Sequence, residues 1–264
     1  MADISSTKPK LDLKDRVIVV TGGAKGIGKV YSTRLAEAGA RVVIADIDGE
    51  ANETLAKAIN GAGGQALPRA TDVSSPESTQ AMADAAAKAF GRIDGLVNNA
   101  SLMSVLARRS WFEIPVEEWD RVMAVNLRGI FLCCRAVYPQ MKKQGGGKII
   151  NISSSRVWEG TPNRLHYTTS KAGVVGLTRA LAREVGDDNI TVNSISPGFT
   201  LSETQVANSS NAYVANKAMA LANKSLKRDQ VPDDLVGALL FLLSDMSNYI
   251  TGQTINIDGG HMMH

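Results

Sequence analysis

A tyrosine and a lysine stand four residues apart in the stretch "HYTTSK", as Tyr167 and Lys171. If this stretch is helical, both side chains lie on one face, because residues four apart are neighbours on a helix surface. A tyrosine phenol has a pKa of about 10 and is a weak base at neutral pH, but a neighbouring ammonium stabilises its phenolate. The pair therefore indicates a general acid/base, with Tyr167 moving the proton. The same spacing also occurs by chance in helices, with the tyrosine half-buried and the lysine solvated.

Ser154 lies thirteen residues before Tyr167 and directly follows the apolar run "KIINIS". We expect that run to be a strand, and in open α/β sheets ligands bind beyond the carboxyl ends of the strands. A hydroxyl at that edge can hold a substrate oxygen beside the phenol.

Glycine makes up four of the nine residues in "TGGAKGIGK", from Thr21 to Lys29, which follows the apolar run "VIVV". Glycine disfavours regular structure, so this density indicates a backbone shape or a nearby ligand that side chains would obstruct. A glycine-rich turn between a strand and a helix presents backbone N–H groups and the positive helix end to a pyrophosphate. The pattern alone favours ligand binding, although glycines also form tight turns for purely structural reasons.

Two charged residues bear on the choice between NAD and NADP. Asp46 ends the second apolar run, where a carboxylate accepts hydrogen bonds from an adenosine ribose and repels a 2′-phosphate. Lys25 favours NADP, because its ammonium can pair with that phosphate. Unit charges about 4 Å apart interact by about 4 kcal/mol at an effective dielectric near 20, so we expect the carboxylate to outweigh a mobile, solvated lysine. We therefore predict NAD, although Asp46 could also cap the next helix and Lys25 could be a solvated turn charge.

Short apolar runs rich in β-branched residues alternate with segments of helical periodicity. The seven candidate strands are 16–20, 41–46, 64–72, 94–99, 147–153, 190–196 and 253–258, and the helical segments include 30–39, 75–90, 115–143 and 172–185. Most runs are apolar along their whole length, which is typical of parallel strands with helices on both faces. We expect one α/β domain over 1–264 with a Rossmann-type, doubly wound, parallel seven-stranded sheet. It would include an N-terminal extension over 1–14 and a polar, Asn-rich segment, 199–233, that covers the substrate.

The composition is that of a globular protein, with 44% hydrophobic and 21% charged residues among 264. The net charge of +3 comes from 29 basic and 26 acidic residues that are scattered along the chain, which disfavours a nucleic-acid partner. Cys133 and Cys134 are adjacent, so a disulfide between them would be strained and a reducing compartment is expected. Because we find no apolar leader and no run of about 18 apolar residues, we expect a cytoplasmic protein without a membrane partner.

Together these motifs resemble the short-chain dehydrogenase/reductase family over nearly the whole chain. The matching features are "TGGAKGIG", Asp72 with Val73, "NNAS", Asn126 in "VMAVNLRG", Ser154, Tyr167 with Lys171, "SPG" at 196–198 and "ITGQTINIDGG". Two positions depart from the family pattern, since Ser101 replaces the last glycine of NNAG and Ser202 stands where a threonine is common. Neither departure removes a catalytic group.

The resemblance implies a catalytic tetrad of Asn126, Ser154, Tyr167 and Lys171. Tyr167 would transfer the proton and Ser154 would orient the carbonyl or hydroxyl. Lys171 would lower the pKa of Tyr167 and bind the nicotinamide ribose, and Asn126 would anchor a proton-relay water. The implied cofactor contacts are Gly22, Lys25, Ile27, Asp46, Asp72, Val73, Asn99, Tyr167, Lys171, Pro197, Thr200 and Ser202.

Candidate substrate contacts follow from their positions after the strands: Met103, Arg156, Trp158 and Phe199. Most are apolar, which suits a hydrophobic or aryl secondary alcohol and its ketone. Arg156 either grips a substrate carboxylate or phosphate or, as is commoner for arginine, lies on the surface. His166 is expected to point about 100° away from Tyr167 around the helix, towards solvent or a subunit contact.

We therefore expect an NAD-dependent oxidoreductase that transfers hydride between the cofactor and a secondary alcohol or ketone. The alternatives are an NADPH-dependent ketoreductase, for instance of the 3-oxoacyl type, and a non-catalytic NAD-binding sensor. The resemblance also implies a homotetramer formed through the helices that carry Asn126 and Tyr167. We assign no metal, because His261 and His264 in the tail "HMMH" are more simply explained by terminal packing or disorder.

Overall fold

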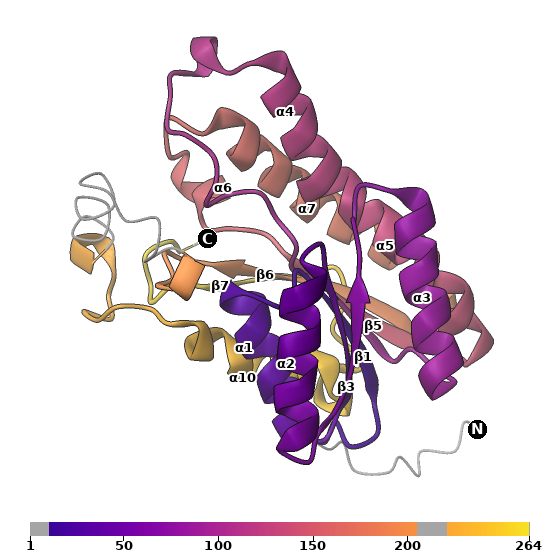
Figure 1. Ribbon diagram of the computed structural model, residues 1–264. Coiled ribbons are helices and arrows are strands. Elements are labelled where there is room, and N and C mark those ends of the chain that lie inside the picture. The colour runs from indigo at the N-terminus through magenta and orange to yellow at the C-terminus, as the bar shows by residue number, and fades with distance from the viewer. Residues whose placement is uncertain (1–10, 205–220, 264) are drawn as a thin grey trace.

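The computed structural model describes residues 11–204 and 221–263 of the chain. Its centre is a parallel sheet of seven strands in the order β3-β2-β1-β4-β5-β6-β7 (Figure 1). The strands are β1 Val17–Thr21, β2 Arg41–Asp46, β3 Gln65–Ala70, β4 Gly95–Asn98, β5 Gly147–Ile152, β6 Ile190–Pro197 and β7 Thr254–Ile257. Each of them falls within or overlaps a run predicted from the sequence, so the predicted Rossmann-type sheet is confirmed.

Burial differs between the middle and the edge of this sheet. β1 and β4 are buried at every position, which explains why their sequences are continuously apolar. β3 is partly exposed and contains Pro68, which a sheet tolerates at its edge because proline donates no ladder hydrogen bond.

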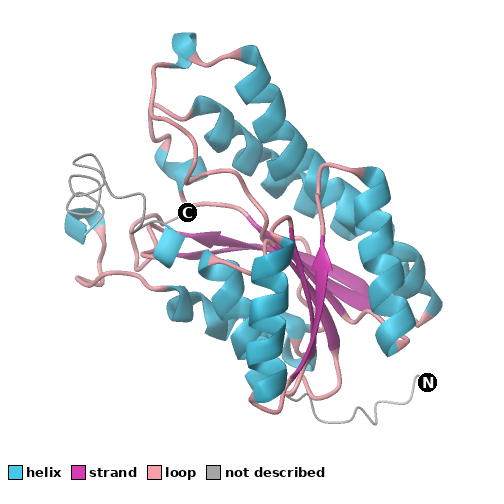
Figure 2. Ribbon diagram, in the orientation of Figure 1, coloured by secondary structure: helices cyan, strands magenta, loops and turns pink. Residues whose placement is uncertain are grey.

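Helices cover both faces of the sheet (Figure 2). The helices α1, α2 and α10 pack on one face, and α3, α4, α5 and α7 lie on the other (Figure 1). Their bounds are α1 Gly26–Glu37, α2 Gly49–Gly61, α3 Pro76–Phe90, α4 Val116–Met123, α5 Gly129–Lys143, α6 Arg156–Glu159, α7 Leu165–Glu184 and α10 Val236–Leu243. Short turns complete the chain: η1 Trp111–Glu113, η2 Ala124–Arg128, η3 Gly186–Asp188, η4 Pro232–Leu235 and η5 Asp245–Ser247.

The helices α4 and α5 are joined by the π-helical turn η2 into one run, Val116–Lys143. Within the described ranges, this run is the one helix that is long and apolar enough to cross a membrane. We did not predict a membrane-spanning helix from the sequence. Half of its most apolar window is buried inside the fold, where Ile130 and Val137 belong to the core on one side of the sheet. Cys133 and Cys134 lie in the same core as free thiols. The apolar character of the run is that of a core helix.

The direction of the strand order changes at β1, which has β2 on one side and β4 on the other. The segments that follow β1 and β4 therefore diverge and leave a crevice at the carboxyl edge of the sheet, where ligands bind in open α/β folds. At the same edge, Thr200 and Gln230 form a parallel bridge that joins the two ends of the segment 199–233. Its middle part, 205–220, lies outside the described residues, as do residues 1–10 of the predicted N-terminal extension.

Candidate active site

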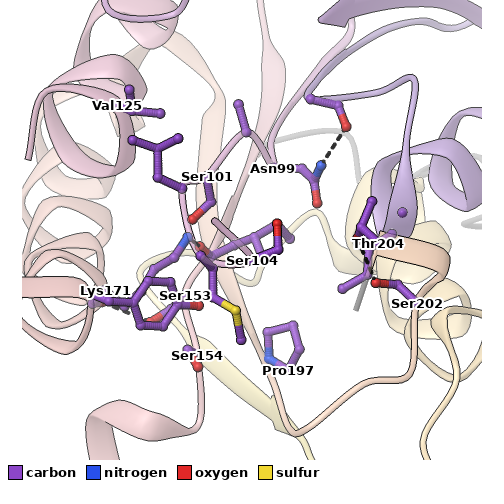
Figure 3. Close-up of a pocket in the computed structure, with 18 of the residues that line it drawn as sticks. Asn99, Ser101, Ser104, Val125, Ser153, Ser154, Lys171, Pro197, Ser202 and Thr204 are labelled. Atoms are coloured by element: carbon purple, nitrogen blue, oxygen red, sulfur yellow. Dashed lines mark hydrogen bonds between the residues drawn. The ribbon is translucent and has the colours of Figure 1, made fainter. Parts of the chain in front are cut away.

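A cavity of about 540 Å³ lies at this carboxyl edge. Its wall combines the glycine-rich turn, the end of β2, the segments after β4, β5 and β6, and the start of α7 (Figure 3). The predicted residues that line it are Gly22, Lys25, Ile27, Asp46, Asp72, Val73, Asn99, Met103, Ser154, Arg156, Tyr167, Lys171, Pro197, Phe199, Thr200 and Ser202. Asn126 and Trp158 are not part of the wall. With Asp72 and Val73 after β3, residues from seven segments of the chain thus meet where a strand-end ligand would bind.

The glycine-rich turn is packed too tightly for side chains. A Cβ on Gly28 would lie 1.9 Å from the carbonyl oxygen of Gly22, and Gly22 itself has a φ of +58°. The Asn99 amide donates hydrogen bonds to the carbonyls of Thr21 and Gly22, at 3.1 and 3.0 Å, and so fastens the turn to the end of β4. These glycines are therefore required by the tight packing of the turn. The turn places the start of α1 at the cavity.

The start of α1 binds a negative group in this structure. The backbone N–H of Gly26 donates to Oε1 of Glu203 at 3.3 Å, and the Lys29 ammonium lies 3.2 Å from Oε2 of the same carboxylate. The first N–H groups of a helix lack partners inside the helix and favour anions. The Glu203 carboxylate is thus a stand-in for an anion at the place expected for a pyrophosphate, and the turn fits a dinucleotide.

Asp46 and Lys25 favour different cofactors, since the carboxylate favours NAD and the ammonium favours NADP. The Asp46 carboxylate accepts hydrogen bonds from the N–H groups of Ala24 and Asp48, at 3.3 and 3.1 Å, and lines the cavity. The Lys25 ammonium is paired with Asp48 at 2.5 Å, and a hydrogen bond to Asp48 is the main reason why the pKa of Lys25 is raised. Lys25, which could favour NADP by pairing with a 2′-phosphate, is therefore already paired with Asp48 in the structure.

Tyr167, Lys171 and Ser154 come together as the spacing predicted. The helix α7 begins just before Tyr167, and the Lys171 ammonium lies 5.8 Å from the centre of the tyrosine ring. The same ammonium donates to the carbonyl of Ile152 at 2.8 Å, and the Ser153 hydroxyl donates to the carbonyl of Lys171 at 2.9 Å. These bonds tie the middle of α7 to the end of β5, which carries Ser154 into the same wall (Figure 3).

The burial of this group determines its acid–base properties. Burial lowers the pKa of Lys171 to about 7. Burial also raises the pKa of Tyr167, while a hydrogen bond with Ser154 and the positive charges of Arg156 and Arg164 act in the opposite direction. In the structure, Ser154 and two arginines thus oppose the effect of burial on the phenol. The effect of Lys171 on the phenol stays a prediction.

Asn126 lies behind the cavity wall, in the π-helical turn η2. Its Oδ1 accepts from the Leu102 N–H at 2.7 Å, and its Nδ2 donates to the Leu102 carbonyl and the Ser170 hydroxyl, both at 3.2 Å. The wider π turn is a common feature of functional sites. Asn126 thus holds the segment after β4 against the helix that carries Tyr167. Its role in anchoring a proton-relay water stays a prediction.

His166 differs from the expectation of a solvent-facing side chain. It is fully buried, and its Nε2 lies 3.1 Å from Oε1 of Glu118 on α4. Arg109 binds the other oxygen of Glu118 at 3.3 Å. Burial lowers the pKa of His166 against the opposing effect of Glu118. The face of α7 next to Tyr167 is covered by α4, so His166 anchors these two helices.

Three of the residues predicted to contact a substrate line the cavity, namely Met103, Arg156 and Phe199. Trp158 lies elsewhere, because its indole N–H donates to Oδ1 of Asn256 at 3.0 Å. Several other wall residues were not predicted to belong to the site: Ile47, Ser74, Ser104, Arg121, Glu159, Thr161, Thr204 and His261. Across the cavity, the Ser202 hydroxyl shares a hydrogen bond of 3.0 Å with Thr204 (Figure 3).

Comparisons with known proteins agree with this site. A family model described as "Enoyl-(Acyl carrier protein) reductase" matches residues 22–262. The chain is 40% identical over 253 residues to the probable galactose dehydrogenase of Rhizobium meliloti, covering 94% of this chain and 96% of the relative. It is 38% identical over 252 residues to the 3-oxoacyl-[acyl-carrier-protein] reductase of Thermotoga maritima, covering 94% and 98%.

Among solved structures, the chain is similar to a 7α-hydroxysteroid dehydrogenase complexed with NADH and 7-oxo glycochenodeoxycholic acid. The TM-score is 0.89 at 30% identity, with 98% of this chain and 99% of the other covered. The match therefore extends over both the sheet and the segments that form the cavity. With the glycine-rich turn and the Tyr167, Lys171 and Ser154 group on one cavity, this chain belongs to the short-chain dehydrogenase/reductase family of oxidoreductases.

Proposed function

We propose that this chain is an NAD-dependent dehydrogenase, also working as a ketone reductase, that acts on the CH–OH group of a hydrophobic or aryl secondary alcohol. One observation carries the proposal: Tyr167, Ser154 and Lys171 line the same cavity as the glycine-rich turn. A proton-transfer group and a dinucleotide-binding turn in one cavity are what hydride transfer to or from a carbon–oxygen bond requires.

A bound nicotinamide would supply the hydride acceptor for oxidation and the hydride donor for reduction. The proposed catalytic residues are Ser154, Tyr167 and Lys171. The phenol oxygen of Tyr167 takes the hydroxyl proton when the alcohol is oxidised and returns it when the ketone is reduced. Ser154 holds the same substrate oxygen, and its hydrogen bond with Tyr167 keeps phenol and substrate oxygen adjacent.

Lys171 and Asn126 support these groups. An ammonium has three donors; Lys171 gives one to the Ile152 carbonyl, and the others can reach a ribose hydroxyl. We assign Asn126 the positioning of Leu102 and Ser170. The remaining proposed cofactor contacts, in addition to Tyr167 and Lys171, are Gly22, Lys25, Ile27, Asp46, Asp72, Val73, Asn99, Pro197, Thr200 and Ser202.

The charges at the end of β2 support NAD over NADP. A 2′-phosphate would meet the Asp46 carboxylate, and it would have to compete with Asp48 for the Lys25 ammonium. Asp48 also caps α2 by accepting from the Ala51 N–H at 3.0 Å, so it is held in place independently of Lys25.

A second candidate is an NADPH-dependent ketoreductase for 3-oxoacyl thioesters. The similarity to the 3-oxoacyl reductase of Thermotoga maritima favours it. The two candidates use the same Tyr167 chemistry and differ in the cofactor and in the group attached to the ketone.

The proposal is tested with purified enzyme, NAD+ or NADP+, and a panel of aryl, alicyclic, sugar and hydroxy-acid secondary alcohols. We expect NADH formation with an aryl or alicyclic alcohol, and we expect Tyr167→Phe to abolish it while NADH fluorescence titration gives an unchanged dissociation constant. Tyr138→Phe is the matched control, since Tyr138 bonds to Asp188 away from the cavity. Undiminished turnover by Tyr167→Phe would overturn the proposal, and a preference for NADPH with 3-oxoacyl thioesters would select the second candidate.

We further propose a cytoplasmic homotetramer. A surface groove lined by Leu127, Phe131, Gly173 and Leu177 joins α5 and α7, and the Phe131 side chain is 52% exposed. An exposed apolar patch of this kind is typical of a protein–protein interface. Light scattering after size-exclusion chromatography tests the tetramer, and Phe131→Glu is expected to dissociate it.

We also propose that the segment 199–233 covers the substrate.

A further inference from the structure

Three arginines lie around the part of the cavity wall that contains Met103 and Arg156. Arg108 lies in the segment after β4, Arg156 begins α6, and Arg164 immediately precedes α7. We call these three residues the arginine cluster. Arg156 lines the cavity, and the charges of Arg156 and Arg164 both act on the Tyr167 phenol.

Two guanidinium groups of the cluster have a buried nitrogen that lacks an acceptor among the described residues, Nη1 of Arg156 and Nε of Arg164. The Nη1 of Arg156 is buried and, among the described residues, has no hydrogen-bond partner. A buried polar donor without an acceptor is costly, more so when it is charged. The neighbouring Arg109 also has a buried Nε without an acceptor among the described residues, but its charge is paired with Glu118.

Two hydrogen bonds hold the Arg164 guanidinium in place. Its two terminal nitrogens lie 3.3 Å from the Met103 sulfur and 3.0 Å from the Leu106 carbonyl oxygen. Neither contact neutralises the charge. Arg164 therefore provides a constant positive potential at the wall that contains Met103.

Among the described residues that act on the cluster, positive charges outnumber negative ones. The carboxylate that acts on the cluster is Glu159, which raises the pKa of Arg108 and accepts a hydrogen bond from Thr161 at 2.5 Å. Against this opposing effect, burial and the Arg156 charge lower the pKa of Arg108. Burial and the charges of Arg156 and Arg108 lower the pKa of Arg164 to about 10. Three positive groups facing one negative group form a binding site for an anion.

We propose that the substrate carries an anionic group, a carboxylate, which Arg156 binds while Tyr167 acts on its alcohol carbon. The proposal rests on the proposed function and narrows its substrate class to apolar or aryl hydroxy acids and the matching keto acids. A guanidinium donates two parallel hydrogen bonds to a carboxylate or to a phosphate. The phosphates of a coenzyme A thioester would satisfy the same chemistry, and the experiment separates the two sources.

Binding is measured first, by calorimetry on the Tyr167→Phe enzyme saturated with NADH, so that the result does not depend on turnover. The probes are 3-oxo-3-phenylpropanoate and its methyl ester, which differ by one charge. A second pair compares acetoacetyl-coenzyme A with the acetoacetyl thioester of N-acetylcysteamine, which lacks the phosphates. We expect the acid to bind at least tenfold more tightly than its ester, and Arg156→Gln in the same background to reduce this ratio to about two or less.

Arg183→Gln, at the exposed end of α7, is the matched control and should leave the ratio unchanged. Arg156→Lys should keep part of the preference for the acid, because it keeps the positive charge but cannot donate two parallel hydrogen bonds to a carboxylate. If Arg156→Gln fails to fold, as judged by its NADH affinity and melting temperature, Arg108→Gln provides the second test with a smaller expected loss.

Equal affinity for acid and ester would overturn the inference, and so would a preference that Arg156→Gln leaves intact. A preference confined to the coenzyme A pair would assign the anion to a phosphate and overturn the carboxylate. Turnover of neutral alcohols without any preference would leave the proposed function standing. Tight binding of the acid together with no turnover of any alcohol by the unmodified enzyme would instead reject the proposed function alone.

Discussion

The Lys25 ammonium lies 2.5 Å from the Asp48 carboxylate, so the lysine of the glycine-rich turn is paired within the chain. The pair also explains why the pKa of Asp48 is lowered, with the hydrogen bond to Lys25 as the largest cause. Both side chains are exposed enough for solvent to weaken the pair, so its importance lies in where it holds the lysine. A cofactor phosphate at this position would find the positive charge already engaged.

Replacing Asp46 by Asn should weaken the preference for NADH. The change removes the negative charge that would face a 2′-phosphate and keeps a side chain that can bond to the Ala24 N–H. We expect the ratio of kcat/KM for NADH to that for NADPH to fall by at least about tenfold, which corresponds to about 1.4 kcal/mol. Steady-state kinetics with both cofactors measure it. Asp48→Asn should shift the ratio in the same direction by releasing Lys25, and an unmodified enzyme that prefers NADPH would contradict the argument.

Gly28→Ala should abolish dinucleotide binding. The added Cβ would lie 1.9 Å from the Gly22 carbonyl oxygen, so the turn must open to admit it. Gly237→Ala is the control, because a Cβ there meets no atom within 4 Å and should change the free energy of unfolding by no more than about 1 kcal/mol. NADH fluorescence titration and thermal unfolding distinguish the two variants. Normal NADH affinity in Gly28→Ala would show that the turn is more plastic than its packing indicates.

Lys171→Met should give a more stable and inactive enzyme. The Lys171 ammonium is almost fully buried and bonds to a carbonyl, and burial lowers its pKa to about 7. An apolar side chain of similar length removes the cost of burying a charge, which is often stabilising by about 1–4 kcal/mol. We expect the melting temperature to rise by at least about 2 °C while turnover is lost. A lower melting temperature would mean that the bond to the Ile152 carbonyl outweighs the cost of burial.

The free energy of unfolding should decrease as the pH falls below about 6.5, the ordinary pKa of histidine. Burial lowers the pKa of His166 in the folded state, so below that pH the unfolded chain binds the proton more readily than the folded one. Above pH 6.5 both states are neutral at this residue, and its contribution is constant. Urea unfolding of the unmodified protein and of His166→Gln across this range measures the effect. Parallel curves for the two proteins would exclude His166 as the cause.

The sheet could be predicted from the sequence because its central strands are buried on both faces and are therefore apolar throughout. The predicted helices were recognisable because their apolar positions repeat with helical spacing. The helix α10, Val236–Leu243, was not among the predicted segments, since "VGALLFLL" is apolar all round and carries no periodic signal over eight residues.

The candidate site could be predicted wherever neighbouring residues share an element. Tyr167 and Lys171, four residues apart on α7, are the clearest case. Contacts between distant segments could not be predicted. A helical projection gives the direction of His166 but not the fact that Glu118, on another helix, occupies that direction. The indole of Trp158 is likewise directed away from the cavity by Asn256, almost a hundred residues later in the chain.

The carboxylate of Asp258 accepts hydrogen bonds from the N–H groups of Gly260, His261 and Met262, at 3.0, 3.1 and 3.0 Å. One side chain thereby curls the final residues back so that His261 forms part of the cavity wall. Any affinity tag fused behind His264 would begin four positions after His261, which lies in that wall. Purification handles and immobilisation linkers therefore belong at the opposite end of the polypeptide, and assays on carboxyl-terminal fusions would report on an altered enzyme.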